Sequence, residues 1–182
     1  MAFAALAPEI SLDLSDELSP VDFAASPYDA AIQRADFARP GSEVLPLTEE
    51  RLIVVGAPAL VGTAPLSPAE LARFPLIQQA TRPTLWTDWF AGATHSPLPA
   101  QPRGPRFAHF QMVLAAATAG LGVAILPDIF VTGALANGSL IRAADHALTS
   151  GAPYALIRPA GKPGPALARF ERWLTTPANQ PC

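Results

Sequence analysis

The sequence predicts an α/β fold, because short runs with strand character alternate with segments of helical spacing along its 182 residues. Residues 51–56 form a β-branched run that stops at a glycine, which is typical of a strand buried on both faces. Residues 123–126 form a second apolar run, and a proline ends it. In between, apolar side chains recur at helical spacing over residues 110–121. This alternation favours parallel sheets covered on both faces, with ligands at the carboxyl ends of the strands.

The elements before the first buried run are two short strands. Polar and apolar side chains alternate over residues 9–14, the period of a strand with one buried face, and residues 28–32 give a second short strand. After the buried run, Ser67 has the place of a helix N-cap, with Pro68 at the first helical position and Glu70 at the third. This pattern predicts a short helix that begins with a capping box.

The later elements follow the same alternation. A strand at residues 76–78 precedes a helix at residues 85–90, whose Trp86 and Trp89 are more typical of core anchors than of a ligand site. Leu121 belongs to the apolar stripe of the helix that begins at Phe110 and should face the core. The remaining predictions are a helix at residues 128–135, strands at 139–141 and 154–157, and an amphipathic helix at 165–174.

Composition limits the function classes. The chain is 50% hydrophobic with a net charge of −3 and no basic run that could follow a phosphate backbone, so the sequence itself should bind DNA poorly. The single cysteine, Cys182, excludes an internal disulfide and a cysteine zinc cluster, and His95, His109 and His146 lack metal-ligand spacing. We therefore expect no metal, no cofactor and no enzymatic activity. With no export signal and no run of about 18 apolar residues, a cytoplasmic protein without a membrane partner is expected.

The order of these segments resembles the effector-binding domain of LysR-type transcription regulators, which is itself similar to type 2 periplasmic binding proteins. The run Trp86-Thr87-Asp88-Trp89-Phe90 looks like a family motif of two tryptophans, and residues 116–127 look like its Ala-rich helix end followed by a strand and a proline. The other segments that resemble the family are residues 8–12, 21–23, 28–32, 52–58, 71–77, 138–141 and 166–174. Their order and spacing together carry the resemblance, which runs nearly from end to end.

The resemblance implies two Rossmann-like lobes joined by two crossing strands, residues 52–56 and 154–158. Lobe I would comprise residues 1–55 and 156–182, and lobe II residues 56–155. A small metabolite would bind in the cleft between the lobes and control DNA binding by a winged helix-turn-helix domain. Family members are homodimers or tetramers through this domain, and the ligand acts by favouring one conformation over another.

Two departures from the family pattern limit which features of the family can be assigned to this sequence. The helix-turn-helix region is absent, and so is the opening strand of the sensor fold, which predicts an incomplete first lobe. The second departure is Gln33 followed by Arg34, where the family more often has arginine directly after isoleucine.

The candidate ligand-binding residues follow the predicted strands or lead into the Ala-rich helix. A cleft ligand is held by backbone amides at helix starts and by a few polar side chains at strand ends. An anionic metabolite would suit Arg34 or Arg106, while His109 could equally be a local hydrogen-bonding residue at a helix start. The full set is Ser15, Asp16, Gln33, Arg34, Gln79, Thr81, Arg106, Phe107 and His109.

Two other functions remain open at this point. A solute-binding receptor would need an export signal, and an enzyme of a related two-lobe α/β fold, such as a prephenate dehydratase, would need its catalytic motif. Residues 120–122 do not make a dinucleotide fingerprint, because they close a helix and open a strand, the reverse of a phosphate loop. The sequence favours a ligand sensor over both alternatives.

Overall fold

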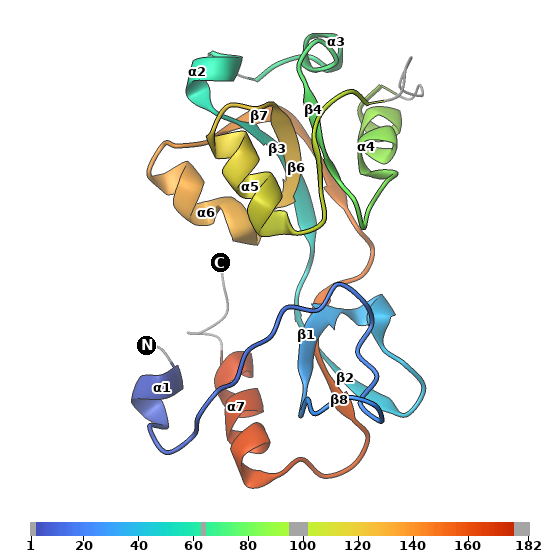
Figure 1. The fold of residues 1–182 in the computed structure, drawn as a ribbon, viewed down its shortest axis with the longest axis vertical. Coiled ribbons are helices and arrows are strands. Elements are labelled where there is room, and N and C mark those ends of the chain that lie inside the picture. Colours follow the sequence, from blue (N-terminus) through green and yellow to red (C-terminus); the bar gives the residue numbers. More distant parts are fainter. Residues whose placement is uncertain (1–2, 63–64, 95–101, 177–182) are drawn as a thin grey trace. The chain divides into compact units, whose positions relative to one another are not determined.

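The computed structural model describes residues 3–62, 65–94 and 102–176, so His95 and Cys182 lie outside the described part. The chain forms two compact units, which Figure 1 shows with their elements labelled. Unit 1 comprises Met1–Glu50 and Gly151–Cys182, and unit 2 comprises Arg51–Ser150. The sequence predicted that residues 52–56 and 154–158 cross between the lobes. In the structure these residues form β3 (Arg51–Gly56), which belongs to the sheet of unit 2, and β8 (Tyr154–Pro159), which belongs to the sheet of unit 1.

Unit 2 is built on a mixed sheet of five strands in the order β5-β4-β6-β3-β7. β4 is parallel to both of its neighbours, whereas β3 is antiparallel to β6 and β7. Three adjacent strands therefore end at one edge, which we call the carboxyl edge of unit 2. The bounds not yet given are β4 (Leu76–Gln79), β5 (Arg106–Phe107), β6 (Val123–Pro127) and β7 (Ile141–Thr149).

Both faces of this sheet are covered by helices (Figure 1). Alternate residues of β3 belong to two different core clusters, one on each face of the sheet. Leu52 and Val54 pack with the aromatic side chains of α4 (Leu85–Thr94). Ile53 and Val55 pack with α5 (Phe110–Thr118) and α6 (Asp128–Ala136). A strand with two buried faces needs apolar residues at every position, as this run has. Two short helices, α2 (Pro58–Val61) and α3 (Pro68–Leu71), complete the unit.

The predicted capping box at α3 is present. The Ser67 hydroxyl oxygen accepts from the Glu70 backbone N–H at 3.3 Å, and the Glu70 carboxylate accepts from the Ser67 backbone N–H at 2.8 Å. These bonds satisfy two backbone donors that have no partner inside the helix. Ser67 thereby fixes the start of α3.

Removing the Ser67 hydroxyl should change the titration of Glu70. The hydrogen bond from this side chain, followed by the one from the Ser67 backbone, lowers the pKa of Glu70 below its ordinary value. The ionised carboxylate therefore stabilises the fold above the ordinary glutamate pKa, and this contribution is lost as the pH falls through the lower, folded-state pKa. In Ser67→Ala the NMR titration midpoint of the Glu70 carboxyl should move up towards the ordinary value. An unchanged midpoint would contradict this assignment.

Unit 1 contains an antiparallel sheet of three strands in the order β1-β8-β2, with β1 at Ala31–Arg34 and β2 at Ser42–Thr48. The helix α7 (Pro165–Thr175) packs against the short helix α1 (Phe3–Leu6) through three aromatic side chains. The centroid of the Phe3 ring lies 5.1 Å from that of Phe170 and 5.4 Å from that of Trp173. A single 3₁₀ turn, η1 (Ala35–Phe37), follows β1.

Arg158 of β8 joins three elements of unit 1. Its guanidinium donates to the carboxylate of Glu171 in α7 at 2.6 Å and to that of Glu43 in β2 at 2.5 Å. These charge-assisted bonds fix α7 against the sheet, since the arginine side chain is mostly buried.

Three expectations are wrong. Residues 9–14 form no strand, because no neighbouring strand pairs with them in the described part of the chain. The sheet of unit 1 is antiparallel rather than parallel, and β3 also pairs antiparallel within unit 2. Leu121 is 53% exposed, because it lies after the end of α5, in the turn between two glycines.

Two strands were not predicted at all. β2 contains a proline and several polar residues, and β5 has only two residues.

Across residues 3–62, 65–94 and 102–176, no helix is long and apolar enough to cross a membrane.

Candidate functional site

Four of the nine candidate residues meet at the carboxyl edge of unit 2. β4 and β5 are parallel with Gln78 opposite Arg106 and Gln79 opposite Phe107, so the residues that follow both strands emerge at the same edge. The helix α5 begins directly after β5, with His109 as its N-cap. In open α/β sheets this edge is where ligands bind. The cluster comprises Gln79, Thr81, Arg106 and His109.

Gln79 holds this edge together rather than facing solvent. Its side chain is only 4% exposed, and its amide nitrogen donates to the Thr81 hydroxyl at 3.0 Å and to the Ala108 carbonyl at 2.7 Å. The Ala108 carbonyl can only accept, so it determines which end of the amide is the nitrogen. Gln79 thus positions the turn after β4 and the residue before the N-cap of α5.

The amide oxygen of Gln79 has no hydrogen-bond partner within the described residues. A buried acceptor without a donor costs on the order of 1–3 kcal/mol, so natural folds rarely leave one unless water or a ligand serves it. The sequence singled out Gln79 as a ligand contact, and the structure shows a positioning role for its nitrogen.

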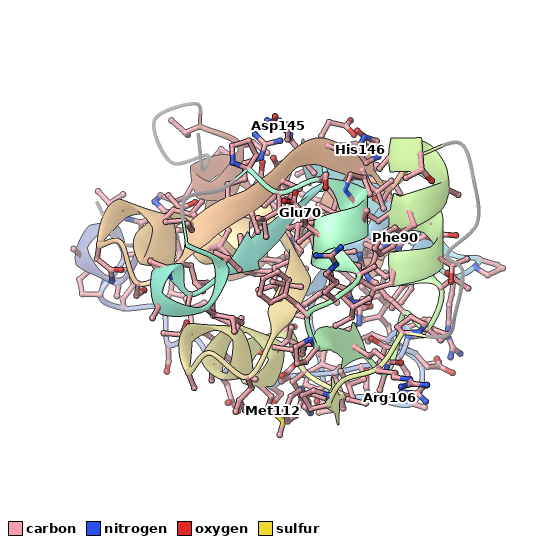
Figure 2. All side chains as sticks on the ribbon, turned by 90° about the horizontal axis from the view of Figure 1, so that it is seen from above. Glu70, Phe90, Arg106, Met112, Asp145 and His146 are labelled. Carbon is pink, nitrogen blue, oxygen red and sulfur yellow. The ribbon has the colours of Figure 1, made fainter. Side chains whose placement is uncertain are left out.

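Positive charge gathers beside the start of α5. Arg106 is exposed, and its guanidinium donates to the carbonyl of Ala80 at 3.3 Å. The guanidinium carbon of Arg82 lies 5.1 Å from the centroid of the Phe110 ring, within the range of a cation–π contact. Both arginines therefore lie next to a helix N-terminus, which itself favours anions. Figure 2 shows Arg106 well away from Asp145 and His146 of the same unit.

Phe107 and His109 contribute through their backbones. The Phe107 carbonyl accepts from the Ala80 N–H at 2.7 Å, and its ring packs against the cluster that contains α5. The His109 carbonyl accepts from the N–H groups of Met112 and Val113, while its side chain forms no capping hydrogen bond. Phe107 is thus a core residue at the margin of the candidate site.

Ser15, Asp16 and Gln33 line a separate hollow of about 240 Å³ in unit 1. The same hollow is lined by Tyr28, whose hydroxyl donates to the Glu17 carboxylate at 2.6 Å. This hydrogen bond raises the pKa of Tyr28 above its ordinary value. The polar side of the hollow is therefore acidic.

Gln33 is used structurally, since its amide nitrogen donates to the Ser19 carbonyl at 2.8 Å and its oxygen accepts from the Val21 N–H at 3.3 Å. Both ends of the amide hold the 17–21 segment beside β1. Arg34 is paired with Asp36, with its Nε 3.1 Å and one terminal nitrogen 2.5 Å from the two carboxylate oxygens. Its charge is therefore already balanced within unit 1.

The sequence missed Arg82 and Tyr28 as site residues. Arg82 lies three positions after the end of β4, so a wider window at that strand end would have included it. Tyr28 gives no such signal, because its partner Glu17 is eleven residues away in a segment without secondary structure.

Comparisons with known proteins agree along nearly the whole chain. The family model described as the LysR substrate binding domain matches residues 1–178. The HTH-type transcriptional activator AmpR of Rhodobacter capsulatus is 30% identical over 176 residues, which are 96% of this chain and 59% of that protein. The HTH-type transcriptional regulator TrpI of Pseudomonas aeruginosa is 34% identical over 171 residues, or 92% of this chain and 57% of that protein. The chain thus spans somewhat more than half the length of these relatives.

Solved structures show the same fold. The effector domain of AmpR of Pseudomonas aeruginosa superposes with a TM-score of 0.81 at 33% identity, covering 94% of this chain and 82% of that one. The AmpR effector binding domain from Citrobacter freundii gives a TM-score of 0.81 at 27% identity, covering 95% of this chain and 86% of that one.

Proposed function

This chain belongs to the LysR substrate-binding-domain family, and from this premise we propose that it binds a small anionic effector at the carboxyl edge of unit 2. One observation carries the proposal: the polar residues that follow β4 and β5 converge beside the N-terminus of α5. Ligand sensing is the role of such domains in transcriptional regulators.

The chemistry of the edge favours an anion. Arg106 has no carboxylate partner among the described residues. The guanidinium of Arg82 lies over the ring of Phe110, the first residue of α5. A carboxylate or phosphate there would accept hydrogen bonds from a guanidinium and from the first backbone N–H groups of α5. The Thr81 hydroxyl, fixed by Gln79, adds a neutral donor or acceptor for a neighbouring group of the ligand.

Replacing Arg106 with glutamine should weaken effector binding. A metabolite library screened by thermal shift on the 182-residue chain identifies a stabilising ligand, because binding to the folded state raises its melting temperature. Loss of one charge-assisted bond should lower affinity for that ligand by about tenfold, or about 1.5 kcal/mol. Isothermal titration measures the change.

Arg73→Gln is the matched control, since Arg73 follows α3, at the amino end of the same strand β4. It removes the same charge and should leave affinity unchanged. Equal losses in both variants would mean a non-specific effect of net charge, and no loss in Arg106→Gln would place the ligand elsewhere.

Regulation is proposed on the same premise. We infer that the effector alters DNA binding by a helix-turn-helix domain carried on the same polypeptide as the sensor, in the cytoplasm, and that the sensor pairs with a second copy. Relatives named as HTH-type regulators support this reading. The sensor itself would carry out no chemical reaction, and a ligand that stabilises the chain should be recovered unaltered.

A further inference from the structure

Two helices begin side by side at the carboxyl edge of unit 2, and their first turns differ in charge. β6 is parallel to β4 and ends at Pro127, so α6 begins at the same edge as α5. The ring centroids of Phe110 in α5 and Phe130 in α6 lie 5.6 Å apart, and Figure 1 shows both helices on one face of the sheet. The first turn of α5 has no acidic residue, whereas that of α6 contains Asp128. The start of α5 therefore favours an anion, and the start of α6 carries one of its own.

The carboxylate of Asp128 has no partner in the part of the chain that the structure describes. The backbone carbonyl of Asp128 accepts from the Thr132 hydroxyl at 3.1 Å, but no described group donates to the carboxylate itself. An acidic residue in a first turn stabilises its own helix through the helix dipole, and it also repels a second anion close by. An effector that carries only negative charge would meet this repulsion at the start of α5.

A second acceptor without a donor lies beneath the same two helix starts. Ile77 and Gln79 are two residues apart in β4, so both side chains are on the sheet face where Ile77 packs with α5 and α6. The register that sets Ile77 opposite Ala124 places Gln79 level with Leu126, two residues before Asp128. The buried amide oxygen of Gln79, without a partner among the described residues, is therefore an acceptor close to the start of α6.

We propose that the effector is a zwitterion, which carries an ammonium group for Asp128 in addition to its anionic group. This inference rests on the anion site proposed above, at the start of α5 beside Arg106. Hydrogen-bond donors gather on the α5 side of the carboxyl edge, and acceptors without donors lie on the α6 side. A ligand with one charge of each sign satisfies both sides, and its ammonium removes the repulsion between Asp128 and the bound anion.

The geometry of the edge also suits the rest of such a ligand. An ammonium group has three N–H donors, so one can serve the Gln79 amide oxygen through an ordered water while the others bind Asp128. The paired rings of Phe110 and Phe130 give apolar surface for the hydrocarbon part of the ligand, since the side chain of Phe130 is 44% exposed. Amino acids and short peptides are the class of metabolite with this combination of groups.

A panel of matched ligands tests the proposal on the 182-residue chain. It contains the common amino acids, β-alanine, 4-aminobutanoate and a set of dipeptides, each beside the carboxylic acid that lacks its amino group. Thermal shift ranks the panel, and isothermal titration gives the affinity of the best zwitterion and of its partner without the amino group. The zwitterion should bind about tenfold more tightly, because only it forms the charge-assisted bond to Asp128. The proposal is wrong if no zwitterion stabilises the chain, or if the partners without the amino group bind equally well.

Asp128→Asn assigns this preference to one residue. It should weaken binding of the zwitterion by about tenfold and should not weaken binding of the partner without the amino group, so the preference disappears. The preference is a ratio measured within one variant, so a general loss of stability at the start of α6 does not change it. Asp145→Asn is the matched control, since it removes the same charge from β7, which Figure 2 shows well away from Arg106, and it should keep the preference. A preference that survives in Asp128→Asn overturns the proposal.

Arg106→Gln separates this proposal from the anion site on which it rests. It should weaken both members of a matched pair by the same factor, because both carry the anionic group. If Arg106→Gln weakens both members while Asp128→Asn leaves the preference intact, the anion site stands and the zwitterion is wrong. If Arg106→Gln weakens neither member, the anion site is wrong and the zwitterion proposal fails with it.

Discussion

Replacing Trp89 with alanine is expected to lower the free energy of unfolding of unit 2 by about 3–5 kcal/mol. Trp89 is 0% exposed and packs edge-to-face on Phe90, with ring centroids 5.1 Å apart. Its indole N–H donates to the His146 carbonyl at 3.2 Å, so the substitution opens a cavity and also leaves a carbonyl of β7 without this donor. Urea unfolding followed by circular dichroism measures the change.

The loss of stability in Trp89→Ala depends on the burial of Trp89. A second substitution, at an exposed apolar residue, tests this. Leu121→Ala removes an apolar side chain that is 53% exposed, and it should lower the free energy of unfolding by no more than about 0.5 kcal/mol. Trp89→Phe keeps a ring and loses the hydrogen bond, so its effect should lie between the two. If Trp89→Ala were no more harmful than Leu121→Ala, the helix α4 would not be anchored as described.

Replacing Gly122 with alanine should destabilise unit 2 by about 3 kcal/mol. A Cβ at this position would lie 2.3 Å from the Pro75 carbonyl oxygen and 3.0 Å from its carbon. The same oxygen accepts from the Val123 N–H at 2.9 Å, so the backbone cannot move away without breaking the contact that aligns β6 with β4. Thermal unfolding of the variant checks this value.

A glycine in α6 provides a control of opposite sign. No heavy atom lies within 4 Å of a Cβ built at Gly133, which is inside a helix, so Gly133→Ala should raise the free energy of unfolding by about 0.5–1 kcal/mol. Similar melting temperatures for Gly122→Ala and Gly133→Ala would contradict the close approach of Gly122 to Pro75, the residue before β4.

The sequence predicted the buried half of the fold better than the exposed half. The runs that became β3 and β6 carry apolar residues on both faces, and the capping box at Ser67 is a local signal that needs no partner. The alternating residues 9–14 misled the prediction, because alternation describes one segment whereas a strand needs a second one beside it. β2 was not predicted because its sequence includes a proline and three polar residues, Ser42, Glu43 and Thr48.

The candidate site was predicted only to the level of strand ends. Gln79 and Thr81 were named because they follow a predicted strand, and Arg106 because its segment leads into the Ala-rich helix and resembles a ligand-lining stretch of the family. The pairing of β4 with β5, which was not predicted, brings these residues to one edge. Pattern reasoning could not reveal that both ends of the Gln33 amide are bound to the 17–21 segment, or that Arg34 is paired with Asp36. Such assignments depend on where irregular segments lie, and those carry no periodicity.

A map of effector contacts by NMR tests the central claim most directly. The metabolite with the largest thermal shift is titrated into the labelled chain, and changes in backbone amide shifts are followed residue by residue. The account predicts that the largest changes cluster at residues 79–82 and 106–111, where β4, β5 and the start of α5 meet. Saturable changes confined to other parts of the chain, with these residues unaffected, would contradict it.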